Sequence, residues 1–285
     1  MNPFTGGCHY NMGCRRFEDS CGKCPQLGSF KENDLSRYIW DYKNSAYQKA
    51  IQKNQLSVVA TSEWMMDEAK RSALLSDAQI QLIPYGLDHE VFQPRDTSGM
   101  RTALGVPEEN LIVLFVAESI RNQRKGFDLL AKALSGISEE NVTLISVGGQ
   151  ENNIQFEKSH YHLGTIESNE LLSVFYSLAD IFVIPSRQEA FGQTALESMA
   201  SGTPVVGFNT GGIPDMVRPG ETGWLAETGN ARALRQAIER ALSHEIERER
   251  RGRRCREVVE KEYTLATQAK AYRRLYEKTI SKNAA

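Results

Sequence analysis

The sequence predicts an α/β fold in which a doubly wound parallel sheet occupies the second part of the chain. The first observation is a set of continuous apolar runs with the length of buried parallel strands, at 111–117, 142–147, 180–184 and 204–208. The second is a set of segments with helical periodicity, at about 126–136, 168–178, 192–201 and 230–243. Strands that alternate with helices pair in parallel, and such sheets bind ligands at the carboxyl ends of their strands.

The first part of the chain contains too few strand patterns for a complete sheet. Helices are predicted there at about 34–53 and 63–74, and short strands at 56–60 and 80–84. The stretch 84–94 is bracketed by two prolines, which predicts a linker between domains. We therefore predict an incomplete domain over 1–83 and a complete one over 95–262.

Charge and hydropathy exclude several classes of partner. The chain has 285 residues, of which 34 are basic and 36 acidic, so its formal net charge is −2 and it has no general attraction to nucleic acid. The longest apolar run, 111–117, is far shorter than the roughly 20 residues that cross a bilayer, and no signal-peptide pattern is present. These features predict a cytoplasmic protein. The basic stretch 250–254 leaves peripheral membrane association open, although a solvated helix face explains it more simply.

Residues 189–197, EAFGQTALE, place two glutamates on either side of a glycine, directly after the apolar run 180–184. The first N–H groups of the helix that follows have no intrahelical partner and can bind phosphate, and Gly192 lets the backbone approach a ligand. Glu189 and Glu197 would repel the phosphate but accept hydrogen bonds from hydroxyl groups beside it. The pattern favours a sugar nucleotide. The alternative left open is that Glu189 caps the helix and Glu197 lies on the surface.

The stretch 186–206, SRQEAFGQTALESMASGTPVV, resembles the E-x7-E signature of retaining glycosyltransferases with the GT-B fold, of the group 1 or family 4 type. Further segments extend the resemblance over about 80–228: IPYGLD at 83–88, RKGFDLL at 124–130, GGIPD at 211–215 and GETG at 220–223. The N-terminal segments FTGGCHY and CGKCPQL resemble those of enzymes that assemble bacterial surface polysaccharides.

This resemblance implies a reaction and a fold. A sugar would pass from a nucleotide-diphosphate sugar to a glycan or lipid-linked acceptor with retention of configuration, in cell-surface polysaccharide biosynthesis. The fold would be GT-B, with two Rossmann-like domains, of which only the C-terminal, donor-binding one is complete here. No cofactor is implied for transfer, because Lys125, an arginine and the helix end can replace a divalent ion.

The resemblance also implies roles for individual residues. Glu189 would hold hydroxyl groups of the donor sugar and stabilise the developing oxocarbenium ion, Lys125 would neutralise the leaving diphosphate, and Glu197 would bind the ribose diol. Further contacts to the sugar, the phosphates and the base would come mainly from the backbone of Ala190, Phe191, Gly192, Gln193, Thr194, Gly164, Thr165 and Ile166.

The second cation of the site is less clearly marked. The family often has Gly-Arg after the first strand of this domain, whereas residues 116–119 read VAES. Arg121 or Arg124 would supply the charge instead, and Arg124 is preferred because it adjoins Lys125. Both arginines also fit solvated positions in a loop.

Four of the five cysteines form a separate cluster. Cys8, Cys14, Cys21 and Cys24 follow the spacing C-x5-C-x6-C-x2-C, which fits a structural zinc ion. Free thiols in a compact loop are the alternative, while a reducing compartment disfavours disulfides. His9 is a further candidate ligand.

The short N-terminal domain leads to expectations about assembly and activity. The final helix, within 263–285, would cross back to the N-terminal domain in the resembling family. Because that domain is predicted to be incomplete, part of the helix would be exposed or covered by another chain, which favours self-association. The chain by itself is expected to bind a nucleotide or sugar nucleotide weakly and to show little or no transfer, so a turnover of roughly 1 per second or more would contradict this expectation.

Two other function classes remain open. A catalytically idle module that binds sugar nucleotides or a partner would carry the same 189–197 pattern, and binding without turnover would identify it. A zinc-binding interaction protein could use the cysteine segment, but the neutral charge argues against nucleic acid as its partner.

Overall fold

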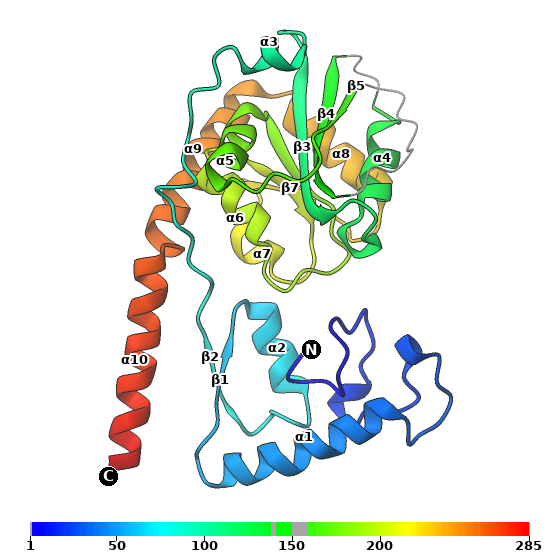
Figure 1. The fold of residues 1–285 in the computed structure, drawn as a ribbon, viewed down its shortest axis with the longest axis vertical. Coiled ribbons are helices and arrows are strands. Elements are labelled where there is room, and N and C mark those ends of the chain that lie inside the picture. Colours follow the sequence, from blue (N-terminus) through cyan, green and yellow to red (C-terminus); the bar gives the residue numbers. More distant parts are fainter. Residues whose placement is uncertain (1, 138–140, 150–158, 285) are drawn as a thin grey trace. The chain divides into compact units, whose positions relative to one another are not determined.

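The chain divides into two compact units, Met1–Pro84 and Tyr85–Ala285. The structure, a computed structural model, describes residues 2–137, 141–149 and 159–284 (Figure 1). The division falls at the start of the stretch predicted to be a linker, and the rest of that stretch belongs to the second unit. Leu87 donates its N–H to the Tyr263 carbonyl at 2.8 Å, and the Phe92 ring packs against Tyr176 with centroids 6.3 Å apart.

The first unit contains one two-stranded parallel sheet and two α-helices. Its elements are α1 (Leu35–Gln52), β1 (Ser57–Ala60), α2 (Glu63–Arg71) and β2 (Gln79–Leu82), preceded by the short 3-10 helices η1 (Arg16–Glu18) and η2 (Pro25–Leu27). Asp34 and Ser62 cap the two α-helices, since their side chains accept the N–H groups of Arg37 and Met65. The buried core of this unit comprises Phe4, Phe17, Trp40, Ala69, Leu74 and Leu75.

The second unit is built on a six-stranded sheet with the order β5-β4-β3-β6-β7-β8, and every adjacent pair is parallel. The strands are β3 (Leu111–Ser119), β4 (Val142–Gly149), β5 (Ser159–His162), β6 (Ile181–Ile184), β7 (Val205–Phe208) and β8 (Gly223–Ala226). The predicted α/β fold with a parallel sheet is confirmed. The edge strands β5 and β8 were not among the predicted strands.

Helices cover both faces of this sheet (Figure 1). The described helices of the second unit are α3 (Met100–Leu104), η3 (Gln123–Lys125), α4 (Phe127–Leu134), α5 (Asn169–Leu178), α6 (Gln193–Ala200), α7 (Ile213–Met216), α8 (Ala231–Leu242), α9 (Glu245–Glu262) and α10 (Leu265–Ala284), of which α10 contributes no residue to either core. Because side chains alternate along β3, Ile112 and Leu114 pack with α5, α6 and α9, whereas Val113 and Phe115 pack with α4 and α8. The sheet therefore has one apolar core on each side.

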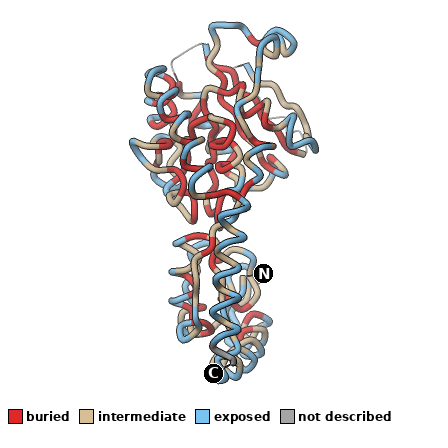
Figure 2. Tube along the Cα trace, turned by 90° about the vertical axis from the view of Figure 1, so that its left-hand side faces the viewer, coloured by how far each residue is buried: buried red, intermediate tan, exposed pale blue. Residues whose placement is uncertain are grey.

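The basic stretch 250–254 lies in α9 and is held by partners within the second unit. Arg251 stacks on the Trp224 ring at 3.9 Å from its centroid, and Arg254 pairs with Glu221 at 2.6 Å. In contrast, Leu265, Tyr276 and Ile280 of α10 are exposed apolar residues. Figure 2 colours much of the C-terminal helix as exposed. Over the described parts of the chain, no helix combines the length and apolar character needed to cross a membrane.

Candidate functional site

The candidate site lies where the strand order of the large sheet reverses. From β3 the chain adds β4 and β5 on one side, then returns to add β6, β7 and β8 on the other, so β3 and β6 are neighbours. In parallel α/β sheets, the crevice at the carboxyl ends of two such strands is the usual ligand site. The loops that leave β3 and β6 carry residues 120–126 and 185–192.

These two loops are joined closely by backbone contacts. The Arg187 N–H donates to the Arg124 carbonyl at 2.8 Å, and the Arg187 side chain pairs with Asp128 at 2.6 Å. Gly126 has φ +72°, and a Cβ atom there would lie 1.9 Å from the Pro185 carbonyl oxygen. Only glycine permits this approach, which fixes the β3 loop against the β6 loop.

Three donors converge on one oxygen of Glu189. Lys125 Nζ lies 2.7 Å from Glu189 Oε2, Arg124 Nη1 lies 3.2 Å from it, and the Ser186 hydroxyl donates to it at 3.3 Å. Arg124 also donates to the Gln188 carbonyl at 3.0 Å. The Glu189 side chain is only 10% exposed, so these charges interact in a weakly screened environment.

The structure thus brings the predicted residues Lys125, Arg124 and Glu189 into one cluster. Arg121, the other candidate, donates its backbone N–H to the Ser119 hydroxyl at 3.3 Å. The roles assigned to these residues stay predictions, but their geometry puts two cations beside a carboxylate. Such a cluster can bind an anion and polar hydroxyl groups at the same time.

The N-terminus of α6 adjoins this cluster. Gly192, with φ +102°, precedes the helix, and its carbonyl accepts the N–H groups of Ala195 and Leu196 at 2.9 and 3.2 Å. The N–H groups of Gln193 and Thr194 therefore point out of the first turn, as expected for a site that binds phosphate. Phe191 is buried with its ring 6.2 Å from that of Tyr263, so only its backbone is available to a ligand.

The second glutamate of the pattern is held from inside the core. The Tyr176 hydroxyl donates to Glu197 Oε2 at 3.0 Å, and Tyr176 itself is fully buried. Burial raises the pKa of Glu197 to about 7, although the Tyr176 hydrogen bond and the nearby Lys125 charge both lower it. Lys125 therefore interacts with both glutamates of the 189–197 pattern. Sequence reasoning did not identify Tyr176, because an aromatic residue at a buried helix position predicts only packing.

The raised pKa of Glu197 predicts a measurable dependence of stability on pH. Protonation of Glu197 favours the folded chain, so its stabilising contribution is complete below pH 4.5 and is lost as the pH rises through about 7. At pH 8 the buried charge should cost on the order of 2 kcal/mol. We expect Glu197→Gln to raise the free energy of unfolding by about that amount at pH 8 and by little at pH 5, measured in urea. An equal change at both pH values would contradict the assignment.

The segment predicted to hold the base lies beside the end of β4. Gly148 donates its N–H to the Gly164 carbonyl at 2.8 Å, so 164–166 runs along the carboxyl end of the sheet. Gly164 has φ +66° with open space where a side chain would begin. Thr165 lies near Gly149, at the end of β4. The backbone of Gly164, Thr165 and Ile166 is therefore at the correct edge of the sheet to contact a ligand.

The structure does not support the predicted zinc ion. Cys8, Cys14, Cys21 and Cys24 are free cysteines around one small cavity, but within the described ranges no three His, Cys, Asp or Glu side chains are arranged to hold a metal ion. Burial raises the pKa of Cys8 and raises that of Cys21 to about 11. Both shifts favour the thiol form of these two side chains.

The comparisons with known proteins agree with one another. The family described as "Glycosyl transferases group 1" matches residues 96–258. The chain is 30% identical over 206 residues to the D-inositol 3-phosphate glycosyltransferase of Acidothermus cellulolyticus. The matched region covers 65% of this chain and 45% of that protein. It spans about half the length of the curated relatives that it matches.

Solved structures share the fold. The sucrose-phosphate synthase of Thermosynechococcus elongatus has a TM-score of 0.75 at 28% identity, over 95% of this chain and 66% of that chain. The Anabaena protein HepE, solved in complex with UDP and glucose, has a TM-score of 0.69 at 20% identity, over 84% of this chain and 67% of that chain.

Proposed function

The chain belongs to the glycosyl transferase group 1 family, and from this premise we propose that it transfers a sugar from a nucleotide-diphosphate sugar to a glycan or lipid-linked acceptor. The observation that carries the proposal is the cluster of Lys125, Arg124 and Glu189 beside the N-terminus of α6. Cations and a helix end suit a diphosphate, and carboxylates suit the sugar and ribose hydroxyl groups on either side of it.

The donor would lie across the carboxyl ends of β3, β4 and β6. Its diphosphate would contact Lys125, Arg124 and the first N–H groups of α6, and its sugar would contact Glu189. Glu197 would accept hydrogen bonds from the ribose diol, and the backbone of 164–166 would contact the base. The two cations and the helix end supply positive charge for the leaving group from the chain itself.

The chemical step would break the bond between the anomeric carbon and the oxygen of the β-phosphate. Negative charge develops on the diphosphate, where Lys125 and Arg124 stabilise it, and positive charge develops on the sugar, where Glu189 stabilises it. The acceptor hydroxyl attacks the face that the diphosphate leaves and passes its proton to the departing phosphate oxygen. The configuration at the anomeric carbon is then retained. The coupling constant of the anomeric proton in the NMR spectrum of the product tests this expectation.

The acceptor side of the proposal rests on the sequence resemblance alone. Bacterial surface-polysaccharide assembly supplies glycan and lipid-linked acceptors, and we include that setting in the proposal. We also include in the proposal association with a second copy through the first unit and peripheral association with a membrane. Each is open to direct measurement, by sedimentation velocity and by flotation with vesicles.

Binding of the donor is the first test of the function. We expect UDP-, GDP- or ADP-glucose to raise the melting temperature of the chain, and Glu197→Ala to weaken binding of the best of them by about 1–3 kcal/mol in calorimetry. Glu239→Ala, on the outer side of α8, is the matched control and should bind like the wild type. Unchanged affinity in Glu197→Ala would exclude its contact with the ribose. Binding without any sugar release would favour the idle binding module instead.

A further inference from the structure

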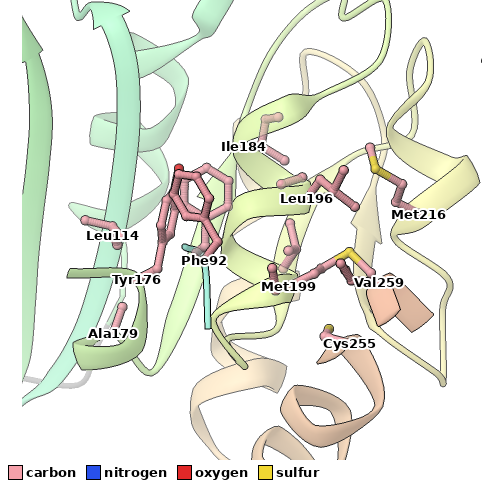
Figure 3. Close-up of a cluster of buried hydrophobic side chains, with 14 of the residues drawn as sticks. Phe92, Leu114, Tyr176, Ala179, Ile184, Leu196, Met199, Met216, Cys255 and Val259 are labelled. Carbon is pink, nitrogen blue, oxygen red and sulfur yellow. The ribbon is translucent and has the colours of Figure 1, made fainter. Parts of the chain in front are cut away.

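Tyr176 places a polar group inside an otherwise apolar core. Its side chain is fully buried and packs edge-on against Phe182, with ring centroids 5.4 Å apart. It also packs edge-on against Phe92, at a centroid distance of 6.3 Å (Figure 3). A phenol hydroxyl in such surroundings costs stability unless it is hydrogen-bonded. A phenylalanine would fill the same space without that cost, so packing alone does not account for the hydroxyl.

The hydroxyl has one described partner, and that partner belongs to the candidate donor site. It donates to Glu197 Oε2 at 3.0 Å. The charged and titratable groups that act on Glu197 are Tyr176, from α5, and Lys125, from the β3 loop. Lys125 is itself bound to Glu189 at 2.7 Å. Glu197 is thus fixed on one oxygen by the Tyr176 hydroxyl.

The backbone around Tyr176 is also held firmly. The Thr203 hydroxyl donates to the Tyr176 carbonyl at 2.6 Å. On the same helix, Ser173 donates to the Gln93 carbonyl at 3.0 Å and its hydroxyl lies 3.2 Å from that of Ser201. These contacts tie α5 to the segment after α6, so the Tyr176 hydroxyl is a fixed donor rather than a mobile one.

We propose that Tyr176 is a positioning residue for donor binding, which holds one oxygen of the Glu197 carboxylate so that the other faces the ribose diol. The inference rests on the proposed function, because it assumes that Glu197 binds the donor. The hydroxyl also favours the ionised carboxylate, which accepts hydrogen bonds from both ribose hydroxyl groups, over the protonated one. Donor binding should therefore weaken as Glu197 becomes protonated.

The test compares three variants of the full chain. Tyr176→Phe removes only the hydroxyl, and Tyr263→Phe is its matched control, because that hydroxyl is also buried but donates to the Asp215 carbonyl at 3.2 Å. Glu197→Gln keeps an acceptor for Tyr176 and removes the titration. The Glu197 carboxyl is followed by carbon-13 NMR without ligand, and UDP-glucose affinity is followed by calorimetry from pH 6 to 8.5.

In the wild type and in Tyr263→Phe, the Glu197 carboxyl should titrate near pH 7, and the affinity for UDP-glucose should be about tenfold lower at pH 6 than at pH 8. In Tyr176→Phe, the midpoint of the NMR titration and the midpoint of the pH dependence of UDP-glucose affinity should both rise by about half a pH unit or more. In Glu197→Gln, the affinity should not vary with pH. A loss of affinity in Tyr176→Phe that is the same at every pH would indicate a merely structural role.

The measurements distinguish a failure of the role of Tyr176 from a failure of donor binding. The wild type could bind UDP-glucose while the Glu197 carboxyl titrates at the same pH in Tyr176→Phe as in Tyr263→Phe. That result would overturn the role of Tyr176 and leave the proposed function intact. Failure of the wild type to bind UDP-, GDP- and ADP-glucose at any pH would overturn both. UDP-glucose does not itself titrate in this range, so a pH-dependent affinity reports on the protein.

Discussion

Glu189→Gln is expected to lower the rate of sugar release from the bound donor by about 10² to 10³ while changing donor affinity by about threefold or less. The carboxylate sits between Lys125, Arg124 and the Ser186 hydroxyl, and its side chain is only 10% exposed. A neutral amide keeps the shape but cannot balance the positive charge that develops on the sugar. The diphosphate keeps both of its cations, so binding in the ground state is largely preserved.

Single-turnover release of glucose from UDP-glucose, together with calorimetry, measures both parts of this result. Glu239→Gln on α8 removes a carboxylate from the outer surface and should leave the rate and the affinity as they are. Glu189→Gln could instead lose donor affinity and keep the wild-type rate of glucose release at saturating UDP-glucose. Glu189 would then act only in binding, and its role in stabilising the oxocarbenium ion would be wrong.

The central strands of the fold could be predicted because burial on both faces leaves an unmistakable apolar run. The strands β3, β4, β6 and β7 are such runs, and each was predicted to within a few residues. The edge strand β5 reads Ser-His-Tyr-His and is partly exposed, so its composition carries no comparable pattern. Helix α9 was not predicted as a whole because its buried face includes Arg248 and Arg251, whose aliphatic stems replace apolar residues.

In the candidate site, the features that could be predicted also lie close together in the sequence, whereas contacts between distant segments could not be predicted. The pattern at 189–197 could be read from neighbouring residues, and Lys125 followed from the resemblance. The bond from Tyr176 to Glu197 could not, because it joins two helices whose packing is set by the whole core. The preference for Arg124 over Arg121 rested on its position next to Lys125, and the structure adds its contact with Glu189. The zinc prediction was not supported because cysteine spacing does not fix where the sulfur atoms lie.

Gly211→Ala is expected to destabilise the second unit by about 3 kcal/mol or more and to abolish donor binding. Gly211 has φ +56°, and a Cβ atom there would lie 1.8 Å from the Glu189 carbonyl oxygen and 2.8 Å from its carbonyl carbon. The next residue, Gly212, donates its N–H to that same carbonyl at 2.9 Å. Because the obstacle is backbone, it cannot rotate away. The Glu189 backbone would have to move, which would take the carboxylate from Lys125.

Gly229→Ala separates this contact from the general cost of a left-handed residue. Gly229 has φ +77°, and a Cβ atom there would meet nothing within 4 Å, so alanine should cost only about 1 kcal/mol of backbone strain and leave UDP-glucose affinity unchanged. Calorimetric unfolding and donor titration of both variants measure the difference. If Gly211→Ala cost no more than Gly229→Ala and still bound the donor, the 210–212 loop would be free to yield. The position of Glu189 would then depend on Lys125 and Arg124 rather than on the backbone behind it.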